Sequence, residues 1–599
     1  SDMQQAFAGF AVYAISALSV LALALSFAVG RLRRIGGAEP QMRIRNVILR
    51  AAGLAAVFTA AIVLVFIEVL LFKDYGIHLY EFDVFGILAD SALRRDLGIQ
   101  PAEVLRVTLA AVALIGAELV LIAAAIPAAA WRDGAIARGA GMAMLIAVPG
   151  GLALFRTAEG GIGTDRSEFE SALPLGRQML LRAPSRPFIP VQPRLGRAGY
   201  PVLTPSDSAP MLASKPNIVF FVADGLRGDM FKAELTPNLV RFGQQEDVIV
   251  SRMHVSSGHV SEAGVFGLLY GLSGQAFHSF MEQRVPAFPL EVLRRNGYHT
   301  LMLASSRLSP YPSDQLLQGF DEVIYPKNDD DALILLQRYA DERRADGRPY
   351  FVFAFFYTPH YPFTSAKPAF RKYPMVGPKA RTNYMNDVLQ VDDYFRQVRQ
   401  VIQPELSTGN AVLLATSDHG EEIRDHGVFG HASATFWNEK IVVPMLLQLP
   451  GQSLNAVQKS PSLTAHADVW PTIFDYLRVD SVPTARVFDG RSLLRPASEP
   501  PVALVTGRFF PHADRPSVLV DSAMKYWFRV DGLGANGRLC IVVTRVTDID
   551  DHPRRDAVDT DARMVPAFER LQSTFWRFIQ PMGGGEHAGE SGRAERRIC

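Results

Sequence analysis

The chain has 599 residues. A single hydrophobic core normally supports fewer residues than this, so at least two domains are expected. Its 61 Lys and Arg residues balance 60 Asp and Glu residues, a charge that gives no indication of a nucleic-acid partner. With only two cysteines, Cys540 and Cys599, a disulfide framework is excluded as the main stabilising device.

The first quarter of the chain holds four apolar stretches, each long enough to cross a bilayer, which takes about 20 residues. They run over Phe7–Gly30, Val47–Phe72, Val104–Trp131 and Ala135–Phe155. Their clustering, with few internal charges, argues against buried core helices, and the first is too long for a cleaved signal peptide. The sequence therefore predicts a transmembrane domain of four helices within residues 1–160.

The loops between these stretches differ in charge. The loop after the first stretch is rich in arginine, the short loop after the third is also basic, and the loop after the second is mainly acidic. Because Lys and Arg favour the cytoplasmic side, both ends of the chain are expected outside the cytoplasm. Everything after about residue 156 is then extracytoplasmic, which excludes cytosolic nucleotides as the natural substrate.

Residues 161–215 read as an extracytoplasmic linker. Eight prolines fall between Arg182 and Pro216, a density that helices and central strands do not tolerate. Four arginines in the same stretch would suit anionic lipid headgroups, although a merely solvated connector is the simpler interpretation.

After Pro216 short apolar runs alternate with longer helical patterns. Asn217–Ala223, Tyr350–Phe356 and Asn410–Thr416 are typical of buried strands, and the stretches 331–344 and 384–402 are typical of amphipathic helices. This alternation predicts an α/β domain over residues 216–580, with a mainly parallel sheet covered by helices on both faces. In such sheets the ligand site lies at the carboxyl ends of the strands.

The first predicted strand ends in Asp224-Gly225. A carboxylate at that place is positioned to bind a hard cation, but Asp-Gly is also a common turn, and both interpretations stay open.

A small polar cluster that ends in Ser261 precedes a helical pattern with an apolar face. Ser261 is thus expected at a helix N-terminus, where backbone N–H groups favour anions. As an N-cap it needs no catalytic role. As a nucleophile it needs an activator, and a metal bound by Asp224, Asp418 and His419 would lower the pKa of its hydroxyl.

The third predicted strand leads into Ser417-Asp418-His419-Gly420-Glu421, in which Asp418 and His419 offer an oxygen and a nitrogen ligand to a divalent ion. The alternative is a helix start with Asp418 as N-cap and Glu421 completing a capping box. His431 follows after a loop that contains glycine.

The rest of the soluble part gives weaker signals. His466 and Asp468 precede an amphipathic helix and are interpreted as support for the site or, more simply, as a helix start. Short runs between residues 502 and 547 predict a small antiparallel extension, in which Cys540 would be an inert core thiol. The Gly-rich, charged tail, residues 581–599, is expected to be disordered.

Together these motifs resemble the sulfatase/alkaline-phosphatase superfamily. Asp224-Gly225, the helix start at Ser261, the loop Thr358–Phe363 and the motif Ser417–Glu421 occur there in this order, and the similarity covers about residues 216–480. The run Ser256–Gly271 looks most similar to the PbgA/YejM inner-membrane proteins. Lipoteichoic acid synthase and the lipid A phosphoethanolamine transferases are also similar, although the latter usually carry several disulfides.

The resemblance implies an alkaline-phosphatase-like fold with one or two divalent ions, Mn, Mg or Zn. It implies that Asp224, Asp418 and His419 bind metal together with the nucleophile Ser261. It further implies that His360 and His431 contact the phosphoryl group or the substrate.

The sequence therefore predicts a multi-pass protein of the bacterial inner membrane with a metal-dependent phosphoester hydrolase or transferase domain outside the cytoplasm. A membrane phospholipid or glycolipid would be its substrate. The alternative is a lipid-binding sensor or scaffold of the PbgA/YejM type without useful catalysis. A sulfatase activity is disfavoured, because no Cys or Ser lies in a Cys-x-Pro-Ser-Arg-like context.

Overall fold

The computed structural model describes residues 191–581 and 597–598, except for residues 197–198, 205–206, 208–209, 306–312, 362, 374–378, 427–429, 432–434, 480–483, 498–499, 508–515, 535–536 and 555–563. The four predicted membrane spans, and residues 161–190 of the predicted linker, lie outside the described residues. Among the helices within the described part, none is both long enough and apolar enough to cross a bilayer.

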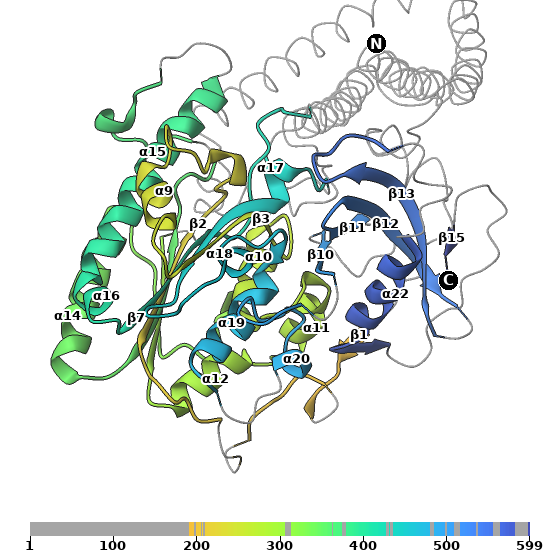
Figure 1. Cartoon of the computed structure of the whole chain (residues 1–599), viewed down its shortest axis with the longest axis horizontal. Helices are drawn as coiled ribbons and strands as arrows, with labels where there is room; N and C mark the ends of the chain where they lie inside the picture. The colour runs from red at the N-terminus through yellow and green to blue at the C-terminus, as the bar shows by residue number, and fades with distance from the viewer. Residues whose placement is uncertain are drawn as a thin grey trace, which may run out of the picture. The chain divides into compact units, whose positions relative to one another are not determined.

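A sheet of eight strands forms the centre of the domain (Figure 1). In spatial order the strands are β5 (Glu322–Ile324), β4 (His299–Ala304), β6 (Tyr350–Phe356), β2 (Asn217–Ala223), β7 (Ala411–Ser417), β8 (Val442–Gln448), β3 (Val248–Val255) and β9 (Thr464–Ala465). Strands β5 to β7 run parallel to one another, and β8 runs antiparallel to both β7 and β3. The predicted mainly parallel sheet is confirmed, and β2, β6 and β7 match the three predicted strands to within one residue.

Strand β2 is buried throughout and is apolar from Ile218 to Ala223, because helices cover both faces of the sheet. Phe220 contacts Trp470 of α19 (Val469–Tyr476), with 5.4 Å between ring centroids, and Phe221 contacts Phe395 of α15 (Lys379–Val401) at 5.6 Å. Adjacent residues of a strand point to opposite faces, so these two contacts place α19 and α15 on opposite sides.

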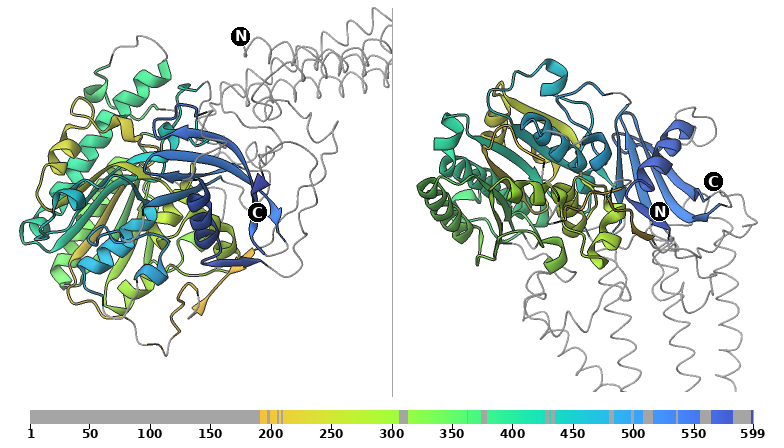
Figure 2. Two further views of the ribbon diagram at one scale, coloured as in Figure 1. Left: turned by 45° about the vertical axis from the view of Figure 1, so that its right-hand side comes forward. Right: turned by 90° about the horizontal axis from the view of Figure 1, so that it is seen from below.

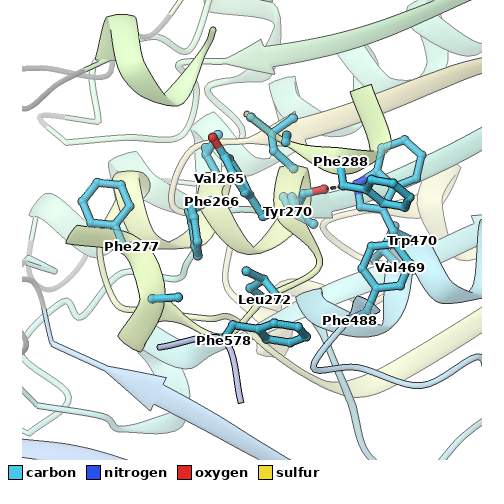
Figure 3. Close-up of a cluster of buried hydrophobic side chains, with 14 of the residues drawn as sticks. Val265, Phe266, Tyr270, Leu272, Phe277, Phe288, Val469, Trp470, Phe488 and Phe578 are labelled. Atoms are coloured by element: carbon cyan, nitrogen blue, oxygen red, sulfur yellow. Dashed lines mark hydrogen bonds between the residues drawn. The ribbon is translucent and has the colours of Figure 1, made fainter. Parts of the chain in front are cut away.

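The remaining helices follow the same division (Figures 1 and 2). Helices α9 (Pro237–Gly243) and α14 (Asp329–Asp346) lie on the side of α15, whereas α10 (Ser261–Tyr270) and α12 (Phe288–Arg295) lie on the side of α19. Figure 3 shows the packing on this second side, where Phe266 and Tyr270 of α10 share one apolar cluster with Trp470.

A second, antiparallel sheet follows in the chain and confirms the predicted extension. Its order is β10 (Val502–Thr506), β11 (Pro516–Asp521), β12 (Met524–Leu533), β13 (Leu539–Asp548) and β15 (Arg597–Ile598), and it is drawn in blue in Figure 2 beside α22 (Met564–Phe575). The pairing of β15 with β13 corrects the expectation that all of the tail is disordered. The pairing uses backbone groups at the open edge of β13, so it does not depend on the amino-acid composition of the tail.

Cys540 corrects a second expectation. It is buried in β13, as predicted, but it is disulfide-bonded and therefore not an inert thiol. The sequence holds one other cysteine, Cys599. Whether a cysteine forms a disulfide depends on the distance to another cysteine in the fold, which the sequence alone does not show.

Part of the predicted linker belongs to the folded domain. β1 (Val191–Pro193) pairs with β14 (Ile579–Pro581), and the Tyr200 side chain is fully buried. The Tyr200 hydroxyl accepts a hydrogen bond from the Phe288 backbone at 2.8 Å, and the ring packs edge-on against Phe578. The aromatic pocket on the domain, not the composition of the linker, decides this packing.

Trp470 anchors α19 to the sheet, so its truncation should be costly. Its indole nitrogen donates to the Leu268 carbonyl at 2.7 Å, and its ring contacts Phe220 and Phe351. Trp470→Ala should lower the free energy of unfolding by about 3–5 kcal/mol, as measured by urea unfolding followed by circular dichroism. Val457→Ala, at a side chain that is 77% exposed, is the control. A loss at Trp470 no larger than in the control would contradict this account of the core.

Candidate active site

Asp224, Asp418 and His419 converge at the carboxyl ends of two neighbouring parallel strands. Ala223, the last residue of β2, is in register with Ser417, the last residue of β7, so the residues that follow both strands meet. One ligand atom from each of Asp224, Asp418 and His419 lies within 4.8 Å of the others, and all three residues are buried. The structure thus brings together the three residues that the sequence suggested as metal ligands.

His419 presents its Nε2 atom to this cluster. Nε2 lies 3.4 Å from Asp418 Oδ2, 3.7 Å from Asp224 Oδ1 and 3.1 Å from Ser261 Oγ. The other ring nitrogen, Nδ1, lies 2.7 Å from the Gly420 carbonyl oxygen, which can only accept a hydrogen bond. Nδ1 therefore carries a proton, and in the neutral ring the lone pair of Nε2 faces the carboxylates and the hydroxyl.

The charges around His419 favour a positive group at Nε2. Burial by itself lowers the pKa of His419, but the carboxylates of Asp418, Asp224 and Glu421 outweigh burial and raise it. A proton at Nε2 and a metal ion in the cluster compete for the same lone pair. Cation binding at this cluster is therefore expected to release a proton.

The donor set fits a divalent cation. Two carboxylates and an imidazole are ligands that Zn²⁺ and Mn²⁺ accept, and the carboxylates also suit Mg²⁺. Asp418 Oδ1 accepts from two backbone N–H groups, those of Gly225 and His419. Asp418 Oδ2 is buried and accepts no hydrogen bond from any residue that the structure describes. A buried carboxylate oxygen in that situation is stabilised by a cation.

Ser261 is the first residue of α10, and Val260 occupies the N-cap position. The interpretation of Ser261 as an N-cap is therefore wrong. The other residues of α10 are all buried, whereas Ser261 is partly exposed. The helix start thus places an accessible hydroxyl beside the buried cluster, with the first-turn backbone N–H groups next to it.

Gly264 allows α10 to approach the end of β7. An ideal Cβ atom on Gly264 would lie 2.1 Å from the Asp418 carbonyl oxygen, which real Cβ atoms do not tolerate. Without a side chain at this position the helix reaches the backbone of a proposed metal ligand, and Ser261 comes within reach of His419.

His360 and His431 extend the cluster on the side of His419. The His431 ring centroid lies 4.3 Å from that of His419 and 5.3 Å from that of His360. His360 Nδ1 lies 2.6 Å from the Tyr361 carbonyl oxygen, so Nδ1 donates and Nε2 is left for other partners. Burial lowers the pKa of His431 well below its usual value, and charges on His419 and His360 lower it further. His431 is therefore neutral at pH 7.

Glu421 belongs to the site, whereas the sequence offered for it only the alternative of a capping box. No helix begins at Asp418 in the described part of the chain, so the helix-start alternative is wrong. The carboxylate of Glu421 is fully buried and lies 3.1 Å from His431 Nδ1. Burial raises the pKa of Glu421 to about 7, although His360, His419 and Lys440 oppose the rise. Glu421 therefore orients His431.

Arg227 links the loops that carry the proposed ligands, and no sequence signal pointed to it. Its guanidinium donates to Asp425 at 2.8 Å, to both carboxylate oxygens of Asp229 and to the Glu421 carbonyl at 3.3 Å. Its backbone N–H donates to the Tyr384 hydroxyl, which in turn donates to the Gly225 carbonyl at 2.8 Å. The loop after β2 and the loop after β7 are thereby held as one unit.

His466 and Asp468 have structural roles. His466 is fully buried, and its Nε2 atom lies 3.0 Å from the Ser417 carbonyl, directly before Asp418. Asp468 accepts hydrogen bonds from the backbone N–H groups of Ala465 and Arg491. The helix-start interpretation holds for Asp468, and His466 supports the end of β7.

Comparison with known proteins assigns the domain. Residues 216–479 match the Sulfatase family, so the chain carries a sulfatase-family domain. It is similar to inner membrane protein YejM of Salmonella typhimurium, with 25% identity over 288 residues that cover 46% of this chain and 44% of that protein. It is also similar to the multifunctional alkaline phosphatase superfamily protein PehA of Trinickia caryophylli, with 30% identity over 114 residues, 19% of this chain and 21% of that protein. The chain thus spans less than half the length of these curated relatives.

Among solved structures, the lipoteichoic acid synthase LtaP of Listeria monocytogenes is similar in fold. It has 14% identity and a TM-score of 0.45, and the match covers 60% of this chain and 90% of that chain.

Gly264→Ala tests the close approach of α10. In an exposed helix this change would stabilise the fold by about 0.5–1 kcal/mol, but here the new methyl group meets the Asp418 carbonyl, and a loss of about 1–3 kcal/mol is expected. The free energy of unfolding, measured in urea, and the metal content after dialysis should both fall. Gly243→Ala, where the nearest atoms are side-chain carbons of Val250 and Leu446 at 3.0 and 3.2 Å and not backbone, is the matched control. Unchanged stability and metal content in Gly264→Ala would contradict the packing argument.

Asp425 gives a pH-dependent prediction. Burial raises the pKa of Asp425, but Arg227 and Arg381 outweigh it and lower the pKa from 3.8 to about 2. Because the folded-state pKa is depressed, this stabilisation is present above pH 4 and is lost as the pH falls through about 2. Asp425→Asn should therefore lower the free energy of unfolding by about 1–2 kcal/mol at pH 6, a value discounted for partial exposure. The loss should become progressively smaller between pH 4 and pH 2.

Urea unfolding across this pH range measures the effect. Asp330→Asn, which removes an exposed partner of Lys367, is the control and should show little cost at any pH. A cost of Asp425→Asn that stays constant down to pH 2 would contradict the ion-pair explanation.

Proposed function

We propose that this chain is a membrane-anchored, metal-dependent phosphoester hydrolase or phospho-headgroup transferase that acts on a lipid or glycolipid through Ser261. The observation that carries the proposal is the 3.1 Å separation of Ser261 Oγ from His419 Nε2, at the buried cluster of His419 with Asp224 and Asp418. A partly exposed hydroxyl in contact with a buried set of cation ligands is the arrangement that an activated serine requires.

Asp224, Asp418 and His419 would hold one divalent ion, Mn, Mg or Zn, and a second ion is compatible with the histidines nearby. A divalent cation at this place lowers the pKa of an adjacent hydroxyl and stabilises negative charge on phosphoryl oxygens. The Ser261 hydroxyl loses its proton to solvent and its oxygen attacks phosphorus. The bond to the leaving group breaks, the departing oxygen takes up a proton to give the alcohol, and a phosphoserine-type ester forms. Water or an acceptor alcohol then displaces Ser261 from phosphorus in a second step of the same kind.

The residues around Ser261 fit the charge that develops during these steps. The first-turn backbone N–H groups of α10 and the positive end of the helix favour phosphoryl oxygens beside Ser261. His360 has Nε2 available for the substrate, since its Nδ1 donates to the Tyr361 carbonyl. His431, held by Glu421, is neutral and can accept a hydrogen bond from a headgroup. We assign substrate binding to His360 and His431.

The lipid substrate and the location are inferred from the rest of the chain. Four apolar stretches before residue 160 are long enough to cross a bilayer, and the basic loops between them favour a domain outside the cytoplasm. The relative YejM is named an inner membrane protein, which supports the bacterial inner membrane as the location. A tethered active site favours substrates that lie in the same membrane.

A second candidate is a lipid-binding sensor or scaffold of the PbgA/YejM type without turnover. The similarity to YejM favours it, but the complete set of Ser261 and three ligands favours retained chemistry. This candidate predicts little bound metal in the purified protein, which elemental analysis would show.

Substitutions at the nucleophile and at one ligand test the enzyme. Ser261→Ala should reduce turnover of bis-p-nitrophenyl phosphate by at least about a thousandfold, because the attacking oxygen is removed. Asp418→Asn should reduce both turnover and bound metal, whereas Ser261→Ala should retain most of its metal. Release of nitrophenol and elemental analysis measure the two effects.

Ser279→Ala is the matched control, since this buried serine donates only to the Ala276 carbonyl and lies outside the site. The control should turn over like the wild type. Wild-type rates in both Ser261→Ala and Asp418→Asn would refute the assignment, and absence of metal from active wild-type protein would refute the metal-dependent mechanism.

A further inference from the structure

An arginine-rich pocket lies between α9 and α15, away from the proposed active site. Its volume is about 310 Å³, and three arginines and three amides line it: Arg241, Arg396, Arg399, Asn238, Gln400 and Gln403. No carboxylate is among the lining residues that the structure describes.

Packing between the two helices fixes the walls of the pocket. The carboxylate of Asp392 in α15 accepts hydrogen bonds from the backbone N–H groups of Asn238 and Leu239 at 2.9–3.0 Å. Phe395, one turn further along α15, packs against Phe242 of α9, with 5.1 Å between ring centroids. These contacts hold α9 and α15 together, so the backbone positions that carry the arginines are fixed before any ligand arrives.

Two of the three arginines lack an anionic partner. Arg396 is paired with Asp393 at 2.6 Å, but the side chains of Arg241 and Arg399 form no ion pair and no hydrogen bond with the described residues. The Arg399 guanidinium lies 5.6 Å above the Phe242 ring, and its Nε atom is buried without an acceptor.

The two unpaired guanidinium groups repel each other. Burial lowers the pKa of Arg399, the charge of Arg241 lowers it further, and Asp247 opposes the shift. Like charges held together in a half-buried pocket raise the free energy of the folded protein, and a bound anion relieves both the repulsion and the unmet hydrogen bond at Nε.

We infer that this pocket is a binding site for a phosphate group, carried either by a lipid headgroup or by a soluble phosphate compound. Guanidinium groups bind the oxygens of phosphate through paired N–H donors. The amide oxygen of Gln400 accepts from Arg396 at 2.9 Å, which leaves its NH₂ group as a donor at the rim, and the NH₂ group of Gln403 keeps one N–H beside the one that donates to Ser407. A volume of about 310 Å³ is at the lower end of ligand pockets, which suits a phosphate-bearing headgroup.

The pocket is separate from the proposed catalytic centre. Tyr384, near the start of α15, donates to the Gly225 carbonyl next to Asp224, whereas Arg399 lies 15 residues further along the same helix. At 1.5 Å per residue this places the pocket about 22 Å away along α15. Phosphate binding there goes beyond the proposed function and does not depend on turnover at Ser261.

Calorimetric titration of the full chain with inorganic phosphate tests the inference. Wild-type protein should bind phosphate with one more site than Arg241→Gln/Arg399→Gln, since any binding at the catalytic cluster is common to both. Phosphate should also raise the melting temperature of the wild type more than that of the double variant. The single change Arg241→Gln, at an exposed and unpaired side chain, should weaken the pocket site at least about tenfold without affecting folding.

Arg338→Gln/Arg538→Gln is the charge-matched control, since Arg338 is exposed, Arg538 is partly exposed, and both are paired with glutamates elsewhere. It should bind phosphate like the wild type and keep the same turnover. Equal phosphate binding in the wild type and in both pocket variants would overturn the inference. An equal loss in the control would also overturn it, because the effect would then be one of net charge.

Two further probes distinguish the sources of phosphate. Dihexanoyl phosphatidic acid, below its micelle concentration, and glycerol 3-phosphate carry the same phosphate group with and without acyl chains. Tighter binding of the lipid, lost in Arg241→Gln, supports a headgroup as the ligand. Equal binding of both probes, lost in Arg241→Gln, supports a soluble phosphate compound, and failure of both to bind would overturn the proposal.

Discussion

Two buried carboxylates at the end of a parallel sheet set the main constraint on this domain. Asp224 and Asp418 follow adjacent strands, and only 4.8 Å or less separates the ligand atoms of the cluster that they form with His419. Burying two like charges so close together is unfavourable unless positive charge neutralises them. These carboxylates raise the pKa of His419, which favours a proton on its ring. A divalent cation neutralises the two carboxylates more fully than one proton does.

The surrounding structure keeps the carboxylates in this unfavourable position. The hydroxyl of Ser256 donates to the Asp418 carbonyl, His466 contacts the Ser417 carbonyl, and Arg227 joins the loops after both strands. Gly264 leaves room for α10, so that a hydroxyl meets the same cluster. The scaffold thus presents buried charge and a hydroxyl together, which supports our proposal that the site is catalytic and not a structural ion site.

Much of the fold and part of the site could be predicted from sequence because they follow from local patterns. Continuous apolar runs predict buried parallel strands, and polar residues directly after them meet at one edge of the sheet, as Asp224 and Asp418 do. Contacts between distant segments left no such pattern. Arg227 and Asp425 are 198 residues apart, and Tyr200 lies in a proline-rich stretch whose composition gives no sign that an aromatic pocket receives it. For Glu421 the sequence offered only a helix start as an alternative role, because a capping box and a His-orienting carboxylate share the same local sequence.

Detection of a covalent adduct on Ser261 tests the central claim most directly. Protein incubated with bis-p-nitrophenyl phosphate is quenched in acid during turnover, digested and analysed by peptide mass spectrometry. We expect the nitrophenyl phosphate group on the peptide that contains Ser261, with fragment ions that locate it on this residue. Turnover with the adduct on another residue, or sustained turnover with no adduct at any quench time, would contradict nucleophilic attack by Ser261.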